Sequence, residues 1–246
     1  LFFLLALGTV VAQPTATPAQ ELLNSTSNLD RLVSRSLVAK LPLTNIGPSV
    51  MSGRVTDIDV NPMAPHEFYV GYASGGLWYT TNNGTTFQPV MDNSPTQNIG
   101  DIAVHWPTHT IYVGTGENNS SRSSYAGIGI LKSTDKGASW QHIGLADSHH
   151  IGKIEINPTD PNEDIVGVTG HLYSSDNVRG IYKTTDGGNT WKQTLSLQDP
   201  VGIIEISVAP ENFGVQYAAA WEKERKAWDF VGSGTGSGIY KSTDSG

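Results

Sequence analysis

The sequence predicts an all-β fold built from repeated four-stranded units, and three observations support this prediction. A turn motif of the form S/T-x-D/N-x-G recurs four times along the chain. Short stretches in which apolar and polar residues alternate precede each copy, and a period of two is typical of strands. The 27 glycines and 13 prolines among 246 residues supply the turns that many short strands need. A helical solenoid, which would show a period near 3.6, is therefore disfavoured.

The recurring motif is predicted to be a tight turn between two strands. Its copies begin at positions 80, 133, 184 and 242, which are 53, 51 and 58 residues apart. The Asp or Asn side chain can accept backbone N–H groups within the turn, and glycine adopts the left-handed backbone that a Cβ opposes. The aromatic residue begins the next strand. We expect a structural role for Asn82, Gly84, Phe87, Asp135, Gly137, Trp140, Asp186, Gly188, Trp191, Asp244 and Gly246.

Two further strands are predicted before each turn motif. The first strands are expected at 55–60, 99–104, 151–156 and 203–208. The second strands are expected at 68–71, 111–114, 165–168 and 217–220. With the two strands that flank the motif, each repeat has four strands, A to D, which is one blade of a β-propeller. The predicted blades are about 53–92, 99–145, 151–196 and 202–246. Because the fourth motif is cut short, we expect an incomplete arc of about four blades.

The first forty residues are predicted to lie outside the propeller. Residues 1–12 form an apolar run that is shorter than the roughly 20 residues of a membrane span. Small residues at Val10 and Ala12 suit a cleavage site, so the run is interpreted as the remnant of a secretory signal. A buried segment at a true N-terminus is the alternative. Residues 13–41 are predicted to be a linker with a short amphipathic helix over 28–40. The protein is therefore expected to be secreted or located in the cell envelope.

Composition excludes several classes of function. Fifteen Lys and Arg against 23 Asp and Glu give a net charge of −8, which argues against nucleic-acid binding. The absence of cysteine excludes disulfides and thiolate metal sites. His105 and His109 are separated by a proline, and the adjacent His149 and His150 should point apart. Neither pair matches a metal motif. We therefore expect no metal and no cofactor.

The repeated motifs resemble those of Asp-box, or bacterial neuraminidase repeat, propellers. That group includes sialidases, xyloglucanase-type glycoside hydrolases and sortilin-type sorting receptors. The segments Asn45–Pro48 and Ser52–Ile58, with Ala73–Trp78 and Gly114–Asn118, resemble the first blades of secreted bacterial proteins in the sortilin-like branch. The resemblance covers about 43–246 and implies either ligand recognition or glycoside hydrolysis. Because the F/Y-R-I-P segment of sialidases is absent, a hydrolase would be more similar to a xyloglucanase.

The position of a ligand site follows from the order of the strands. In an antiparallel blade, the A–B and C–D turns lie on one face, and the B–C loops and D–A connections lie on the other. The longer segments fall on the second face, called here the loop face, and loops on a rigid scaffold commonly carry function. The candidate ligand residues on this face are Arg54, Asp57, Asp101, Glu117, Arg122, His150, Arg179, Trp221, Glu222 and Arg225.

Two interpretations remain open for the charged and aromatic candidates. Paired carboxylates near the propeller axis could form an acid–base couple, or they could only form salt bridges between blades. Trp221 and Trp228 could contact a ligand or pack their loop onto the blade. Aligning the first strands puts four charged residues at equivalent positions: Asp57, Asp101, Lys153 and Glu205. The predicted function is binding of a protein or carbohydrate through the loop face, with glycoside hydrolysis as the alternative.

Overall fold

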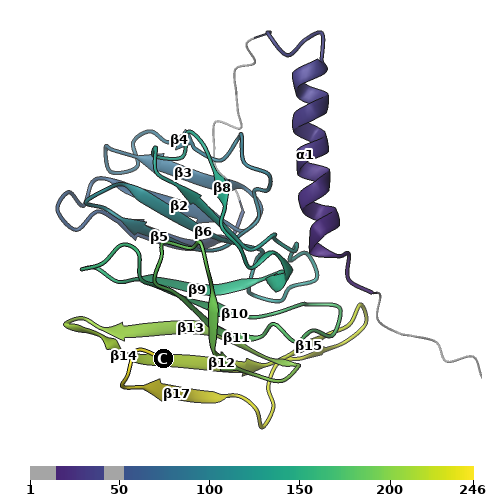
Figure 1. Ribbon diagram of the computed structural model, residues 1–246, viewed down its shortest axis with the longest axis vertical. Coiled ribbons are helices and arrows are strands. Elements are labelled where there is room, and N and C mark those ends of the chain that lie inside the picture. Colours follow the sequence, from purple (N-terminus) through teal and green to yellow (C-terminus); the bar gives the residue numbers. More distant parts are fainter. Residues whose placement is uncertain (1–14, 42–52) are drawn as a thin grey trace, which may run out of the picture.

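The computed structural model describes residues 15–41 and 53–246, and within them it confirms the predicted all-β propeller arc. The blades follow one another in chain order along the long axis of Figure 1, with one helix beside them. Both the proposed signal segment 1–12 and the segment Asn45–Pro48 lie outside the described residues.

Each blade is an antiparallel sheet whose strands are neighbours in sequence order. Blade 1 contains β1 (Val55–Val60), β2 (Phe68–Tyr72), β3 (Gly76–Thr80) and β4 (Gln88–Pro89). Blade 2 contains β5 (Ile99–His105), β6 (Thr110–Thr115), β7 (Ile130–Ser133) and β8 (Gln141–His142). Blade 3 contains β9 (Ile151–Ile156), β10 (Asp164–Val168), β11 (Gly180–Thr184) and β12 (Lys192–Ser196). Blade 4 contains β13 (Val201–Ala209), β14 (Asn212–Glu222) and β17 (Gly238–Ser242).

Neighbouring blades meet through their first strands, β1 on β5, β5 on β9 and β9 on β13. Glycine makes this close approach possible at the start of three of these strands. A Cβ on Gly100 would lie 2.2 Å from the carbonyl oxygen of Ile151, and one on Gly152 would lie 2.3 Å from that of Ile203. Apolar side chains then fill each junction. In the first junction, for example, Ile102 is buried against Leu77.

The Asp side chain of the turn motif accepts hydrogen bonds from within the turn itself. Asp135 accepts hydrogen bonds from the backbone N–H of Ser139 at 2.9 Å and from the hydroxyl of Ser133 at 2.7 Å. Hydrogen bonds from the Ser139 side chain and backbone lower the pKa of Asp135 to about 2. The turn also holds the preceding blade, because the indole N–H of Trp140 donates to the carbonyl of Val90 at 2.9 Å. Trp191 makes the equivalent bond to Ile143 at 2.8 Å.

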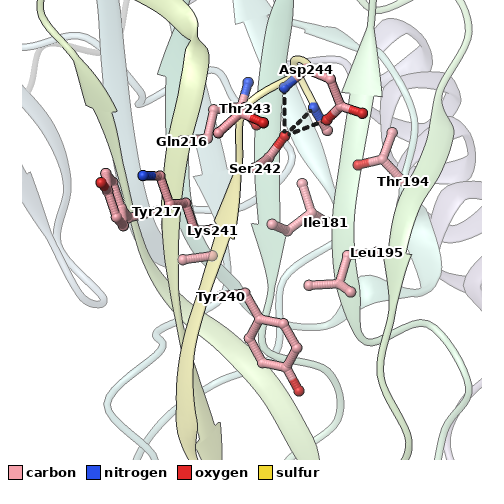
Figure 2. Close-up of a pocket in the computed structure, with 12 residues that line it drawn as sticks. Ile181, Thr194, Leu195, Gln216, Tyr217, Tyr240, Lys241, Ser242, Thr243 and Asp244 are labelled. Atoms are coloured by element: carbon pink, nitrogen blue, oxygen red, sulfur yellow. Dashed lines mark hydrogen bonds between the residues drawn. The ribbon is translucent and has the colours of Figure 1, made fainter.

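A cavity of about 290 Å³ lies between blades 3 and 4 (Figure 2). Its lining includes Ile181, Thr194 and Leu195 on one side and Tyr240 of β17 on the other. A Cβ on Gly246 would lie 3.2 Å from the Thr194 hydroxyl, just as one on Gly188 would meet Ile143. The cavity is therefore in the place where a turn-motif tryptophan packs in the earlier junctions. It is a packing position between blades and lies away from the loop face.

The two ends of the arc expose side chains that are buried elsewhere. Ile58 of β1 is 51 % exposed, although its equivalent Ile102 in blade 2 is buried. At the other end, Ile239 of β17 is 79 % exposed, whereas its equivalent Leu77 in blade 1 is buried. The first and last blades therefore each present a junction face without a partner among the described residues.

The helix α1 (Ala19–Arg35) begins nine residues before its predicted start at 28 and ends five before its predicted end at 40. The Ser/Thr-rich segment that we interpreted as linker is helical, and its hydroxyls find partners within the helix by bonding back to carbonyls about one turn earlier. Ser25 donates to Leu22 at 2.7 Å, for example. Pro18 precedes the first turn, where a proline is well tolerated. The described residues contain no helix that is long and apolar enough to cross a membrane.

Candidate functional site

The B–C loops of blades 2, 3 and 4 converge on the loop face. The ammonium group of Lys223, in the loop of blade 4, donates to the hydroxyl of Ser120 in the loop of blade 2 at 2.7 Å. The Nε of Arg225 donates to the backbone carbonyl of Ser120 at 3.1 Å. Because these two loops meet across blade 3, they are held as one surface. Burial and the nearby Arg179 cation lower the pKa of Lys223 to about 7.

Glu117 lies beneath this loop surface, with only 1 % of the residue exposed. Arg54 makes two hydrogen bonds of 2.5 Å to its carboxylate, one to each oxygen. Nδ1 of His150 donates to the backbone carbonyl of Glu117 at 2.7 Å. Burial, with the Lys223 charge nearby, holds the pKa of His150 well below its usual range, so the imidazole is neutral. These three residues join blade 1, the loop of blade 2 and the start of blade 3.

Arg179 is also buried, with 2 % of the residue exposed. It forms salt bridges with Asp176 at 2.9 Å and Asp199 at 2.8 Å. Its guanidinium also donates to the carbonyls of Thr169 and His171, at 2.9 and 2.8 Å. Because all of these partners lie within the protein, Arg179 stabilises the blade 3 loop and does not face solvent.

The loop of blade 4 is more ordered than its Gly/Ser-rich sequence suggests. It contains a small hairpin of β15 (Glu224–Arg225) and β16 (Phe230–Val231). Trp221 lies edge-on to Phe230, with ring centroids 6.2 Å apart, and its indole N–H donates to Gly232. Glu222 accepts the backbone N–H of Gly236 at 2.6 Å. Trp221 therefore packs the loop, as one of our two interpretations proposed.

Trp228 and Tyr125 are the most exposed aromatic side chains on the described loops of this face. Trp228, at the tip of the hairpin, is 66 % exposed, and Tyr125 in the blade 2 loop is also exposed. Arg122, in the same loop as Tyr125, is an exposed cation. Of the ten predicted ligand residues, Arg122 is exposed, whereas Glu117, His150, Arg179 and Asp101 are buried.

Charged side chains on the first strands form what we call the axial cluster, which consists of Asp57, Asp59, Asp101, Lys153, Glu155 and Glu205. The four residues aligned from the sequence occupy equivalent positions, opposite Gly71, Gly114, Gly167 and Ala219 of the second strands. Lys153 lies 3.7 Å from the Asp57 carboxylate and 3.2 Å from that of Asp101. The salt-bridge interpretation therefore describes these three residues.

Asp101 and Asp59 also bind the next blade directly. Asp101 is buried and accepts the backbone N–H of Ile154 at 2.7 Å. Asp59 accepts the indole N–H of Trp106 at 2.6 Å. Burial raises the pKa of both carboxyls, that of Asp59 to about 6. Both residues tie successive blades together.

Glu155 differs from its neighbours in the axial cluster. Burial, together with the charges of Glu205 and Asp57, raises its pKa to about 7, although Lys153 opposes the shift. Its carboxyl makes no hydrogen bond within the described part of the chain. Sequence reasoning did not select Glu155. Its position two residues after Lys153, on the same face of β9, was the available signal.

The raised pKa of Glu155 predicts a pH-dependent effect of its removal. The folded protein favours the protonated carboxyl, so the contribution of Glu155 to stability is complete below its ordinary pKa and is lost as the pH rises through about 7. Replacement by Gln should raise the free energy of unfolding by about 2 kcal/mol at pH 8 and change it by less than about 0.5 kcal/mol at pH 4. Urea unfolding at both pH values measures this difference, with the exposed Glu211→Gln as control. An equal effect at both pH values would contradict it.

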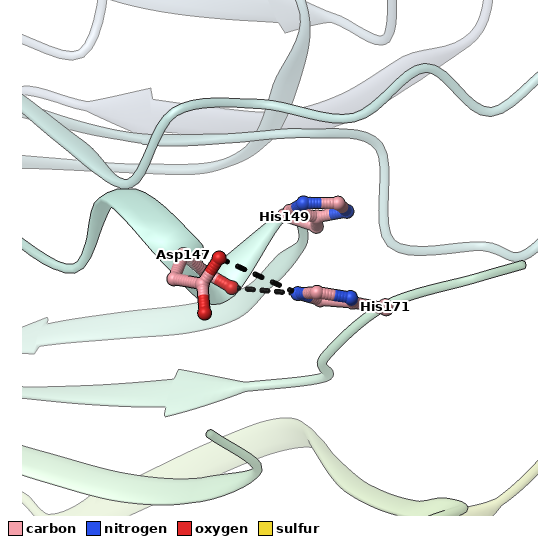
Figure 3. Close-up of side chains that lie close together, drawn as sticks. All are labelled: Asp147, His149 and His171. Carbon is pink, nitrogen blue, oxygen red and sulfur yellow. Dashed lines mark hydrogen bonds and ion pairs between the residues drawn. The ribbon is translucent and has the colours of Figure 1, made fainter. Parts of the chain in front are cut away.

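A second group of titratable side chains lies beside the loop of blade 3 (Figure 3). Asp147 and His149 come from the connection between blades 2 and 3, which contains the short 3-10 helix η1 (Ala146–Ser148), and His171 comes from the B–C loop of blade 3. Their possible ligand atoms all lie within 4.8 Å of one another. We expected no metal from the sequence. This group was not recognised because His171 is distant in sequence and no spacing motif connects it to the other two.

The arrangement of its blades places this chain in the β-propeller class of folds. No family model matches the sequence. It is 27 % identical over 141 residues to a probable oligoxyloglucan-reducing end-specific xyloglucanase of Neosartorya fischeri, a match that covers 54 % of this chain and 16 % of that protein. The chain thus spans only a small part of this relative.

Solved structures support the same class of fold. The GH74 xyloglucanase of Xanthomonas campestris has a TM-score of 0.54 at 16 % identity, over 77 % of this chain and 28 % of that one. The GH74 enzyme of Niastella koreensis has a TM-score of 0.54 at 19 % identity, with the same coverage of 77 % and 28 %. At these identities the likeness concerns the propeller fold.

Proposed function

We propose that this propeller binds carbohydrate at its loop face. The supporting observation is the exposed pair Tyr125 and Trp228 on loops that are otherwise held by buried ion pairs and hydrogen bonds. Exposed rings offer apolar faces on which sugar rings can stack, while neighbouring polar groups bind hydroxyls. The similarity to a xyloglucanase and to GH74 structures favours xyloglucan as the first ligand to test. A carbohydrate ligand also suits the secretion or envelope location that we propose from residues 1–12.

Calorimetric titration with xyloglucan oligosaccharides and a wider glycan panel tests this proposal. Trp228→Ala should weaken binding at least about tenfold, which corresponds to about 1.4 kcal/mol, because an exposed aromatic anchor is removed without disturbing a buried contact. Tyr240→Ala, which removes a partly exposed aromatic from β17 at the end of the arc, is the matched control. Equal affinity of the Trp228 variant and the unaltered protein would contradict the proposal. Binding of peptides without any glycan would favour the sortilin-like alternative.

Glycoside hydrolysis is the second candidate, and Glu155 is the observation that favours it. A carboxyl with a pKa near 7 can act as a general acid, and Glu205 and Asp57 supply carboxylates near it. The same glycan panel can be assayed for new reducing ends. Glu155→Gln should abolish cleavage and retain binding if Glu155 is the acid. The absence of cleavage by the unaltered protein would remove this second candidate and leave the binding proposal intact.

A further inference from the structure

The group of Asp147, His149 and His171 has the chemistry of a transition-metal site. It offers two imidazole nitrogens and one carboxylate from two separate segments, and the three ligand atoms lie within 4.8 Å of one another. Imidazole and carboxylate together suit Zn²⁺ and similar divalent ions, which bind nitrogen and oxygen at about 2.0–2.2 Å. Three protein ligands leave a fourth position for water or another ligand.

An unsatisfied atom supports this inference independently. Nε2 of His149 is buried and has no hydrogen-bond partner within the described residues. A buried polar atom without a partner is costly and needs an explanation, of which a bound ion is one. His149 also has a positive φ of 56°, which non-glycine residues seldom adopt. The imidazole of His149 stacks on that of His171, and the ring centroids lie 3.5 Å apart.

His171 has the second contact that a metal ligand requires. Its Nδ1 lies 2.8 Å from the hydroxyl of Ser174, while Nε2 lies 2.9 Å from the backbone carbonyl of Asp147. Because a carbonyl only accepts, Nε2 carries the proton in this structure and Nδ1 accepts from Ser174. Metal binding would move the proton to Nδ1, which then donates to Ser174, and the ion would replace the hydrogen bond from Nε2 to the Asp147 carbonyl. The carboxylate of Asp147 is 3.9 Å from the same Nε2 and is partly exposed, so an ion can enter from solvent.

We propose that Asp147, His149 and His171 bind a divalent transition-metal ion of the Zn²⁺ type on the loop face. The two rings are nearly parallel, with an angle of 11° between their planes. Binding therefore requires both rings to turn about their Cβ–Cγ bonds so that their lone pairs point at the ion. The ion joins the connection between blades 2 and 3 to the loop of blade 3. Hard ions such as Mg²⁺ and Ca²⁺, which prefer oxygen ligands, bind far more weakly.

Titration of the metal-free protein with Zn²⁺ at pH 7.5, followed by calorimetry and by thermal unfolding, tests the proposal. We expect one ion per chain and a melting temperature that rises with Zn²⁺ and returns after chelation. Asp147→Asn and His149→Gln should each weaken binding at least about tenfold, and Ser174→Ala should weaken it by about tenfold through the orientation of His171. Co²⁺, used in place of Zn²⁺, should give visible d–d bands that the variants lose.

Controls separate this site from general binding by surface histidines. His66→Gln removes an exposed histidine in blade 1 and should leave affinity and stoichiometry unchanged. Circular dichroism of each variant establishes that it is folded, and Asp147→Asn is the variant least able to disturb packing because Asp147 is exposed. The proposal is overturned if the His149→Gln and Asp147→Asn variants bind Zn²⁺ as the unaltered protein does, or if that protein binds none. Loss of Zn²⁺ binding without loss of glycan binding would separate this site from the proposed carbohydrate site.

Discussion

Replacing Arg179 with Met is expected to lower the free energy of unfolding by about 3–5 kcal/mol. The methionine side chain retains most of the apolar stem but removes the guanidinium. Asp176, whose side chain is 1 % exposed, would then keep a buried charge without its cation. The carbonyls of Thr169 and His171 would also lose their donor. Leaving one member of a buried ion pair unpaired is among the most destabilising changes in a protein.

Equilibrium unfolding in urea measures this effect, and the chain supplies a matched control. Arg122→Met makes the same substitution at an exposed position in the blade 2 loop and should change stability by no more than about 0.5 kcal/mol. The double variant Arg179→Met with Asp176→Asn should recover part of the loss, because the uncompensated charge is removed. A loss below about 1 kcal/mol in the Arg179 variant would mean that water reaches Asp176, which would contradict the buried ion pair described above.

The second large effect is expected for Gly116→Ala, which should destabilise the fold by about 3–5 kcal/mol. Gly116 has φ +86°, where an alanine costs about 1–2 kcal/mol. Its new Cβ would lie only 1.8 Å from the carbonyl oxygen of His149. That carbonyl accepts the N–H of Gly127 at 2.7 Å, a bond that joins the blade 2 loop to the start of blade 3. The methyl group must displace this bond, which adds packing strain of about 1–3 kcal/mol.

Gly238→Ala provides the comparison, because a Cβ at Gly238 has nothing within 4 Å and its backbone is not left-handed. It should alter stability by less than about 0.5 kcal/mol. Thermal unfolding of both variants is sufficient, since 1 kcal/mol corresponds to about 2–4 °C in a chain of this size. Similar melting temperatures for the two variants would show that the segment around His149 can move aside.

The sequence was sufficient for the blades because their signals are local. The alternating pattern of a strand, such as 55–60 or 151–156, is contained in a few residues, and so is the turn motif. The strand positions could therefore be inferred, and with them the equivalence of Asp57, Asp101, Lys153 and Glu205. Salt bridging by Lys153 was one of two alternatives, and only the distances between neighbouring blades decided it.

The candidate site was harder to predict because it is formed by loops that meet from different blades. The contact of Lys223 with Ser120 joins positions 103 residues apart, and no pattern in either loop indicates it. The same reason explains why His171 was not connected with Asp147 and His149. In addition, several side chains that were predicted to be exposed are buried. Glu117, His150 and Arg179 were selected as ligand residues because they are polar loop residues, but each is buried by its own hydrogen-bond partners.

The exposed junction faces at the two ends of the arc have a consequence for how stability is distributed. In a linear array, each repeat is stabilised by its own strands and by its contacts with nearest neighbours. Blades 2 and 3 have a neighbour on both sides within the described chain, whereas blades 1 and 4 have one each. In these 246 residues taken alone, opening should therefore begin at blades 1 and 4, with amide hydrogens exchanging earliest in β1 and β17. The histidines of the proposed metal site lie in the protected middle, so they remain in place while the ends of the arc fray.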